Sequence, residues 1–315
     1  MVCKQRWLNR CPVFLKCVTS LTTQRVQTLT TSRVLLMRVS QIWRYPVKSM
    51  IGVDVDFVSL SLLGIVGDRH WAVRDNERGG IRGAKKIGEL MQFSARPADE
   101  SSTHVVITLP NGDEIRSDDT LVDVALSAAL GRSVSLESLP IDGALEHFRR
   151  GPSDSTDVMA ELRGIFGRTE DEPLPDFSVF PPEVAEFESP PGTHHDCWPL
   201  MVMTTSALDA LRTALPESVI DILRFRPSIV IDTPDELGHP EFSWKGRTGQ
   251  LGSAVVEFLD PCPRCVMITR RINDAIPEDR TIMRHVVRDL NQAVGVYARI
   301  VTPGKVSVGD TLTFL

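Results

Sequence analysis

The sequence predicts a β-rich α+β fold made of barrel-like sheets. Short runs in which apolar and polar residues alternate are separated by turns that contain Gly, Pro, Asn or Asp. Helical periodicity is confined to three short segments, so the chain lacks the regular strand–helix alternation of a doubly wound sheet. With 315 residues, 42% of them hydrophobic, the chain can bury a core in each of two domains.

The first domain is predicted at residues 37–142. Alternating runs indicate strands at 39–44, 53–60 and 71–74, and the turn Pro110-Asn111-Gly112-Asp113 joins strands at 105–109 and 114–116 into a hairpin. A helix is expected from Asp119 to Leu130, with Asp118 or Asp119 as its N-cap and Gly131 directly after it. These elements predict a β-barrel-like domain.

Residues 143–197 have the composition of a loop. They are rich in Pro, Asp, Glu, Ser and Phe, as in DEPLPDFSVFPPEVAEFESPPG, and we expect a long loop-rich connection on the surface. The second domain is predicted at 198–315. Its expected strands are 200–203, 228–232, 255–259, 295–301, 305–308 and 311–315, and its expected helices are 205–215 and 280–290.

Basic residues are concentrated at the start of the chain. Residues 1–36 contain six of the 35 basic side chains and no acidic one. This composition is typical of a mitochondrial presequence, but also of an extension outside the fold that precedes a start at Met37. The expected location is therefore the cytoplasm, or the mitochondrion if residues 1–36 are a genuine presequence.

The remainder of the chain is acidic. It holds 29 basic and 41 acidic side chains, a net charge of −12, which argues against general nucleic-acid binding. No apolar run approaches the roughly 18 residues that a transmembrane helix needs.

After residue 36 the chain contains only the thiols Cys197, Cys262 and Cys265. So few cysteines do not form a disulfide framework, and a reducing intracellular compartment is expected.

Two of these thiols stand in Cys262-Pro263-Arg264-Cys265, for which three interpretations are open. A zinc site needs four ligands, so His194, His195 and Cys197 would have to complete it, at a spacing that fits no finger or ribbon. A redox dithiol needs its first thiol at a helix N-terminus, whereas Val266 to Thr269 is predicted as a strand. A single thiolate can instead complete the ligand set of a metal that an organic cofactor already chelates, with the arginine of the motif beside it to bind an anionic group.

Five separated motifs occur in a characteristic order. They are Tyr45-Pro46-Val47-Lys48-Ser49, Gly67-Asp68-Arg69-His70-Trp71, Arg224-Phe225-Arg226-Pro227-Ser228-Ile229-Val230-Ile231, Cys262-Pro263-Arg264-Cys265 and Val308-Gly309-Asp310. Together they resemble the MOSC proteins (molybdenum cofactor sulfurase C-terminal domain) with an N-terminal MOSC β-barrel domain, and in particular their amidoxime-reducing members. The resemblance extends over residues 37–315. It implies a MOSC β-barrel at 198–315, preceded by an N-terminal β-barrel-like domain at 37–142.

The resemblance implies that the protein binds the molybdenum cofactor. Cys265 would be the metal ligand. The residues that would contact the pterin or its phosphate are Lys48, Ser49, Arg69, Arg226, Ser228 and Arg264. The four cationic side chains among them suit an anionic pterin phosphate. Asp196, just ahead of the metal region, would either move protons during reduction of an N–O bond or cap the structure that follows it.

Three features differ from the relatives. Ser228 stands where Asn is usual, and Asp196-Cys197-Trp198-Pro199 stands where the amidoxime reductases have a Thr-Ser pair before Pro. No four-cysteine ferredoxin segment follows Cys265. Electrons would therefore come from a separate flavin, iron–sulfur or haem protein.

The resemblance implies an oxidoreductase that reduces N-hydroxylated small molecules. The alternative is a carrier that passes the molybdenum cofactor or persulfide sulfur to other enzymes without reductase activity. MOSC domains fused to pyridoxal-phosphate sulfurases are thought to act in this way. Pyridoxal phosphate would then have to come from a partner chain, because no domain for it fits into this length.

Overall fold

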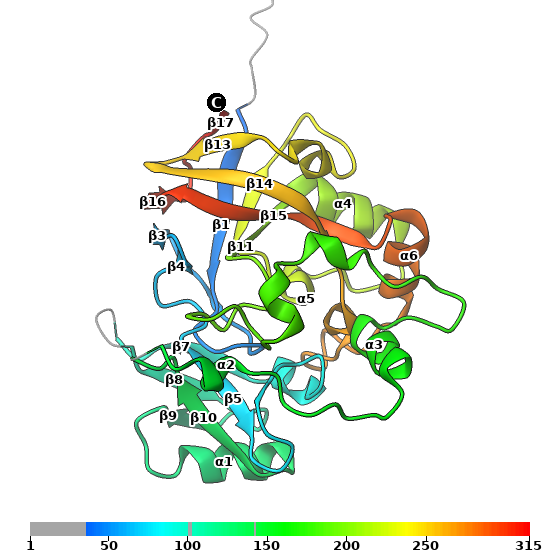
Figure 1. Ribbon diagram of the computed structural model, residues 1–315. Coiled ribbons are helices and arrows are strands. Elements are labelled where there is room, and N and C mark those ends of the chain that lie inside the picture. Colours follow the sequence, from blue (N-terminus) through cyan, green and yellow to red (C-terminus); the bar gives the residue numbers. More distant parts are fainter. Residues whose placement is uncertain (1–35, 100–102, 142) are drawn as a thin grey trace, which may run out of the picture. The chain divides into compact units, whose positions relative to one another are not determined.

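An eight-stranded sheet is the largest sheet in the described part of the protein (Figure 1). The structure is a computed structural model that describes residues 36–99, 103–141 and 143–315. The strand order of the sheet is β17-β13-β14-β15-β11-β12-β1-β2. The strand bounds are Arg38–Arg44 (β1), Val53–Asp54 (β2), Leu200–Thr204 (β11), Ile229–Asp232 (β12), Thr248–Leu251 (β13), Ala254–Pro263 (β14), Ala293–Thr302 (β15) and Leu312–Phe314 (β17). The extension or presequence predicted at 1–36 lies outside the described residues except for Leu36.

Three smaller sheets complete the β structure. Their strand orders are β10-β5-β6, β16-β3-β4 and β7-β8-β9. The bounds are Phe57–Ser61 (β3), Gly64–Ile65 (β4), Trp71–Asp75 (β5), Ile81–Arg82 (β6), Ser94–Pro97 (β7), Val105–Thr108 (β8), Glu114–Arg116 (β9), Val134–Ser138 (β10) and Gly304–Ser307 (β16). The predicted β-rich α+β class is confirmed, and the predicted hairpin is the antiparallel pair β8–β9.

Strands from the beginning of the chain take part in the sheets of its C-terminal half. β1 pairs antiparallel with β12, and β3 pairs antiparallel with β16. The register of β1 on β12 shifts between Val39 and Gln41, and this irregularity lets both Val39 and Ile42 enter the core of the main sheet while Arg38 and Gln41 are exposed. The described residues from 36 onward accordingly belong to one compact unit.

Helices are short and few. The α-helices described are Val122–Leu130 (α1), Leu145–Phe148 (α2), Val158–Phe166 (α3), Thr205–Ala214 (α4), Ile222–Phe225 (α5) and Thr281–Asp289 (α6). The 3-10 helices are Gly88–Gln92 (η1), Phe177–Val179 (η2), Pro182–Ala185 (η3), Pro240–Trp244 (η4) and Val266–Thr269 (η5). Over the described ranges, no helix has the length and apolar character needed to cross a membrane.

The start of α1 differs from the prediction. The helix begins at Val122, its N-cap residue is Leu121, and neither Asp118 nor Asp119 caps it. Asp119 instead accepts a hydrogen bond from the Leu121 backbone N–H (2.8 Å), so its side chain forms a turn just before the helix. Gly131 ends the helix in the left-handed conformation, as predicted.

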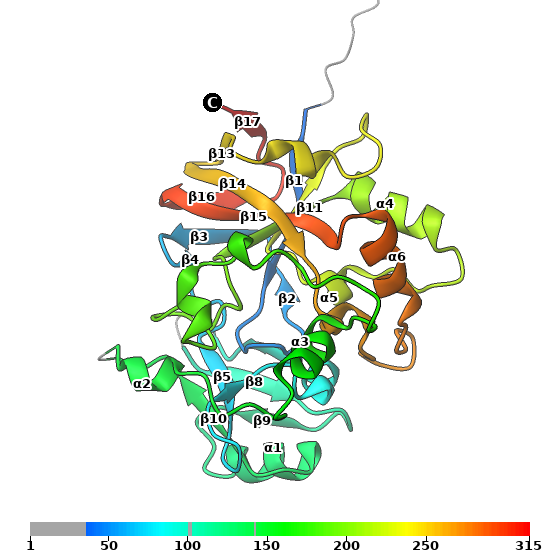
Figure 2. The ribbon, with the colours of Figure 1, turned by 45° about the vertical axis from the view of Figure 1, so that its right-hand side comes forward.

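The connection at 143–197 contains more regular structure than its composition suggests. Helix α3 lies inside it, because the Asp157 side chain caps the Ala160 N–H (3.0 Å) and Gly167 closes the helix in the left-handed conformation. In Figures 1 and 2 this segment lies between the main sheet and the group of strands β5, β8, β9 and β10. The segment therefore contacts both parts of the fold.

The segment after Cys265 also differs from the prediction. Val266–Thr269 was expected as a strand but forms the 3-10 helix η5, with Cys265 as its N-cap residue. Met267, Ile268 and Thr269 are buried, and the Thr269 hydroxyl donates to the Val266 carbonyl oxygen (2.8 Å). Tertiary packing here outweighs the strand preference of β-branched residues.

Candidate functional site

A cavity of about 680 Å³ contains every residue that the sequence singled out for the site. Its lining includes Lys48, Ser49, Arg69, Asp196, Arg226, Ser228, Arg264 and Cys265. These residues come from the first predicted domain, from the end of the connection and from the second predicted domain. The fold thus brings together side chains that are more than 200 positions apart in the sequence, in a volume ordinary for a small-molecule site.

The cavity is cationic although the protein is acidic. Three acidic side chains line it, Glu161, Glu188 and Asp196. The basic side chains in the lining are Lys48, Arg69, Arg82, Lys85, Lys86, Arg150, Arg224, Arg226 and Arg264. An excess of positive charge in a concave site favours an anionic ligand.

Cys265 is the more accessible thiol of the cysteine pair. Strand β14 ends at Pro263 and the chain turns into η5, which leaves Cys265 partly exposed and Cys262 buried. Burial raises the pKa of the Cys262 thiol, and the Arg264 guanidinium opposes that shift. The geometry therefore makes Cys265 the thiol available to a ligand in the cavity.

Arg264 is held by hydrogen bonds from both of its terminal nitrogens. Its Nη1 donates to Cys262 Sγ (3.1 Å) and its Nη2 to the Phe225 carbonyl oxygen (2.7 Å). Its Nε is buried and has no hydrogen-bond partner in the described part of the protein. A buried, unsatisfied guanidinium donor is costly, so an acceptor group of a ligand would stabilise this arrangement.

Three site residues adopt a backbone conformation that is rare without glycine. The φ angles of Ser49, Arg69 and Arg226 are 68°, 48° and 56°. Such conformations cost on the order of 1–3 kcal/mol each and cluster at functional sites. Tyr45 is fully buried beside them, and the guanidinium carbons of Arg69 and Arg226 lie 4.9 and 4.2 Å from its ring centroid. The left-handed backbone and the aromatic ring together fix two cationic groups at the cavity.

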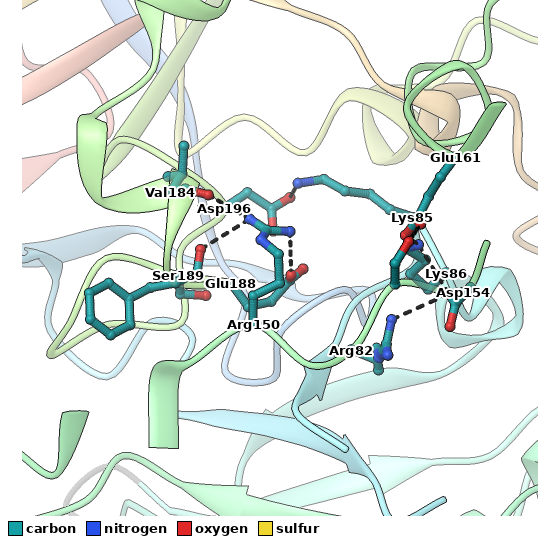
Figure 3. A network of polar contacts seen from close by, with 12 residues as sticks. Arg82, Lys85, Lys86, Arg150, Asp154, Glu161, Val184, Glu188, Ser189 and Asp196 are labelled. Carbon is teal, nitrogen blue, oxygen red and sulfur yellow. Dashed lines mark hydrogen bonds and ion pairs between the residues drawn. The ribbon is translucent and has the colours of Figure 1, made fainter. Parts of the chain in front are cut away.

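The Lys48 ammonium is fully engaged within the protein. It donates to Ser189 Oγ (3.1 Å), the His194 carbonyl oxygen (2.9 Å) and Asp196 Oδ1 (2.6 Å). The other oxygen of Asp196 lies 3.4 Å from Lys85 Nζ (Figure 3). Burial alone would raise the pKa of Asp196, but the two ammonium groups hold it well below its usual range.

Asp196 is therefore a counter-ion in this structure. It accepts no backbone N–H in the described residues, so the capping role that the sequence left open is not observed. Its low pKa also makes it a poor proton donor at neutral pH.

Two remaining hydroxyls differ in how they are used. Ser49 Oγ accepts the Ala84 N–H (2.8 Å), which holds the Gly83–Lys86 turn against the cavity. Ser228 is buried at the start of β12, and its Oγ accepts the Met201 N–H at 3.3 Å. Neither hydroxyl donates to an acceptor within the described ranges, so both can donate to a ligand.

The histidines before Asp196 are buried, which the loop-like sequence around them does not predict. His194 Nε2 lies 2.8 Å from His147 Nε2, and its Nδ1 lies 3.1 Å from the Arg69 carbonyl oxygen. Burial and nearby Lys48 lower the pKa of His194 to about 2. Across the described ranges, no group of three or more His, Cys, Asp or Glu side chains is arranged to hold a metal ion, so a four-ligand zinc site is not assembled there.

Sequence reasoning missed several residues that line the cavity. Lys85 and Lys86 come from one turn, Arg150 comes from the connection, and Phe166, Phe177 and Phe180 form an aromatic group. The consecutive lysines Lys85 and Lys86 are a concentration of positive charge that the sequence does show. The phenylalanines stand in a segment whose composition indicated only a loop.

Two family models match the chain. The MOSC N-terminal beta barrel domain matches residues 36–144, and the MOSC domain matches residues 191–313. The chain therefore belongs to the MOSC-domain proteins that carry an N-terminal MOSC β-barrel domain.

Among individual proteins, the chain is similar to mitochondrial amidoxime reducing component 2 of Bos taurus. The two are 26% identical over 253 residues, which are 73% of this chain and 66% of the relative. The chain thus spans slightly less than two thirds of the relative's length.

Solved structures show more distant likeness. The YUAD protein of Bacillus subtilis aligns with a TM-score of 0.39 and 11% identity, over 88% of this chain and 94% of that chain. YiiM from Geobacillus stearothermophilus aligns with a TM-score of 0.29 and 12% identity, over 38% of this chain and 54% of that chain.

Proposed function

We propose that the protein binds the molybdenum cofactor through Cys265 and reduces N-hydroxylated small molecules. The observation that carries this proposal is the accessible thiol of Cys265 in a cationic cavity beside the unpartnered Nε of Arg264. A soft thiolate suits a transition metal, and a guanidinium suits a phosphate or a pterin oxygen. The similarity to an amidoxime reducing component supports the same assignment.

The residues of the cavity fit this cofactor. Arg69, Arg226 and Arg264 would hold its anionic and carbonyl groups, and the hydroxyls of Ser49 and Ser228 would donate to its ring. Lys85 would add a positive charge to the lining that also contains Cys265. When bound, the cofactor supplies the two-electron redox chemistry that side chains lack.

Lys48 has a different role from the one that the sequence suggested. Its three donors are already satisfied by protein acceptors, so direct contact with a phosphate would require it to exchange one of them. We assign Lys48 and Asp196 to positioning. Their ion pair fixes the end of the connection against the first predicted domain and places Lys85 at the cavity wall.

Reduction of an N–OH group consumes two electrons and two protons, breaks the N–O bond and releases water. In the proposal the electrons come from a separate flavin, iron–sulfur or haem protein. Protons reach the site from solvent along the cavity.

An activity assay tests the function directly. Protein purified with a full complement of cofactor is supplied with a chemical reductant and with an amidoxime, a hydroxylamine or an N-oxide. Formation of the deoxygenated product, abolished in Cys265→Ala, is the expected result. A loaded protein that reduces none of the three classes rejects the reductase assignment. Persulfide on Cys262 or Cys265 with no bound pterin, detected by mass spectrometry, would support the carrier alternative instead.

A further inference from the structure

Helix α3 presents an apolar face that the described protein covers only in part. Val158, Leu162, Ile165 and Phe166 recur at helical spacing, and all four line the cavity. No residue of α3 is buried, and Val158 is 62% exposed. An amphipathic helix ordinarily buries its apolar face, so this face is available to a ligand in the cavity.

Aromatic side chains extend this face. The ring centroid of Phe166 lies 5.7 Å from that of Phe177 and 6.2 Å from that of Phe180, and the last two lie 6.1 Å apart. Trp198 also lines the cavity, with its indole N–H donated to the Val179 carbonyl oxygen (3.0 Å). These four residues and the apolar face of α3 are called the aromatic wall below.

Ion pairs hold helix α3, the helical part of the aromatic wall, against the first predicted domain. Lys86 pairs with Glu161 of α3 and with Asp154 (3.0 Å), and Arg82 pairs with the same aspartate (3.3 Å; Figure 3). Both basic residues belong to the first predicted domain. A wall fixed from outside does not have to be ordered by the ligand, which favours binding.

The lining of the cavity therefore contains two chemically distinct groups of side chains. Arg69, Arg226 and Arg264 are cationic, and the aromatic wall is apolar, while Cys265 belongs to the same lining. The cationic group holds the cofactor in the function proposed above. What remains for the substrate is a surface of aromatic rings and aliphatic side chains, on which the one α3 carboxylate of the lining, Glu161, is already paired with Lys86.

We propose that the aromatic wall binds the body of the substrate and selects neutral aromatic N-hydroxylated compounds over small aliphatic or charged ones. This inference rests on the proposed function, since it names the substrate class of the same site. Aromatic rings pack on one another with a gain beyond simple burial, whereas a methyl group buries little surface. A charged body would lose its hydration without gaining a partner on the wall.

A binding measurement tests the inference without relying on turnover. Benzamidoxime and acetamidoxime share the reacting group and differ only by phenyl against methyl. Affinities are measured by isothermal titration calorimetry on the full chain, as purified and without reductant. Benzamidoxime is expected to bind at least about tenfold more tightly than acetamidoxime, because its phenyl ring buries more apolar surface than a methyl group. Equal affinities would overturn the inference.

Variants locate the effect on the wall. Phe177 is 47% exposed, so Phe177→Ala should fold normally. Phe180→Leu removes the aromatic ring but keeps an apolar side chain, which limits any loss of packing in the folded protein. Each is expected to weaken benzamidoxime binding about three- to tenfold while leaving acetamidoxime unchanged. Phe57→Ala is the matched control, because Phe57 is 57% exposed on β3 and is absent from the cavity lining. Loss of affinity in the control alone, or in none of the variants, contradicts the inference.

The two proposals can fail separately. Tight benzamidoxime binding that depends on Phe177, in protein that reduces no N–O compound, would sustain the aromatic wall and reject the reductase. Reduction of aromatic and aliphatic amidoximes with equal kcat/KM, unaffected by Phe177→Ala, would sustain the reductase and reject the wall as its selector.

Discussion

Replacing Asp196 by Asn removes the carboxylate that neutralises a buried ammonium. The Lys48 side chain is only 2% exposed, and Asp196 is its one ion-pair partner among the described residues. The Ser189 hydroxyl and the His194 carbonyl would remain as acceptors, so the ammonium would keep hydrogen bonds but lose its charge partner. The variant therefore isolates the electrostatic part of the interaction.

The expected cost follows from the surroundings of the pair. A hydrogen bond to a charged group contributes about 1.5–3 kcal/mol. Because the Asp196 side chain is 38% exposed, water would replace part of the interaction, and we expect the lower end, about 1.5–2 kcal/mol in the free energy of unfolding. For a protein of this size that is a fall in Tm of roughly 3–6 °C.

Urea and thermal unfolding of both proteins measure this difference. Asp209→Asn serves as the control, since its pair with Arg212 is exposed on α4 and should contribute less than about 0.5 kcal/mol. The folded pKa of Asp196 is lowered, so its stabilisation is complete above the unfolded pKa of about 3.9 and is lost as the pH falls through the folded value. The difference between wild type and Asp196→Asn should thus be constant from pH 7 to pH 5. A variant as stable as the control would refute the counter-ion assignment.

Two further predictions concern stability. The contacts of Glu137 with His147 and Arg74 lower the pKa of its carboxyl to about 2. The wild type should therefore lose stability as the pH falls from about 4.3 to 2, and Glu137→Gln should show a flatter profile in the same urea series. Parallel profiles for the two proteins would contradict this pairing. In Gly304→Ala the new Cβ would lie 2.5 Å from the Ser253 carbonyl carbon, and backbone must move. We expect a loss of about 1–3 kcal/mol in thermal unfolding, and an unchanged Tm would show that the β16 turn yields freely.

Most strands could be predicted because their signal is local. The strands predicted at 39–44, 105–109 and 114–116 follow from local pattern and turn residues, and the structure has strands there. The pairing of β1 with β12 and of β3 with β16 has no such signal, because it depends on which sheet buries the apolar side of each strand. Helix α3 was hidden by the proline-rich composition around it, although Asp157 and Gly167 are ordinary cap residues. In Val266–Thr269 local preference pointed to a strand, and burial of the segment decided otherwise.

Part of the site could be predicted from the sequence and part could not. The cationic and thiol residues belong to motifs, so a resemblance could single them out. The fold gathers these residues, together with Ser49, Ser228 and Asp196, around one cavity. No motif marks the aromatic wall, whose residues become neighbours only when the connection folds back over the cavity. The state of Lys48 and Asp196 was also inaccessible, because it depends on a contact between residues 148 positions apart.

The central claim is that Cys265 holds the molybdenum cofactor. Metal analysis combined with pterin fluorescence, on protein produced in a host that makes the cofactor, tests it most directly. Wild type and Cys197→Ala, which removes a buried thiol of the same cavity, should contain molybdenum and pterin in equal amounts, and Cys265→Ala should lack molybdenum. Zinc in the wild type, or molybdenum retained in Cys265→Ala at the level of the Cys197→Ala control, would contradict the account.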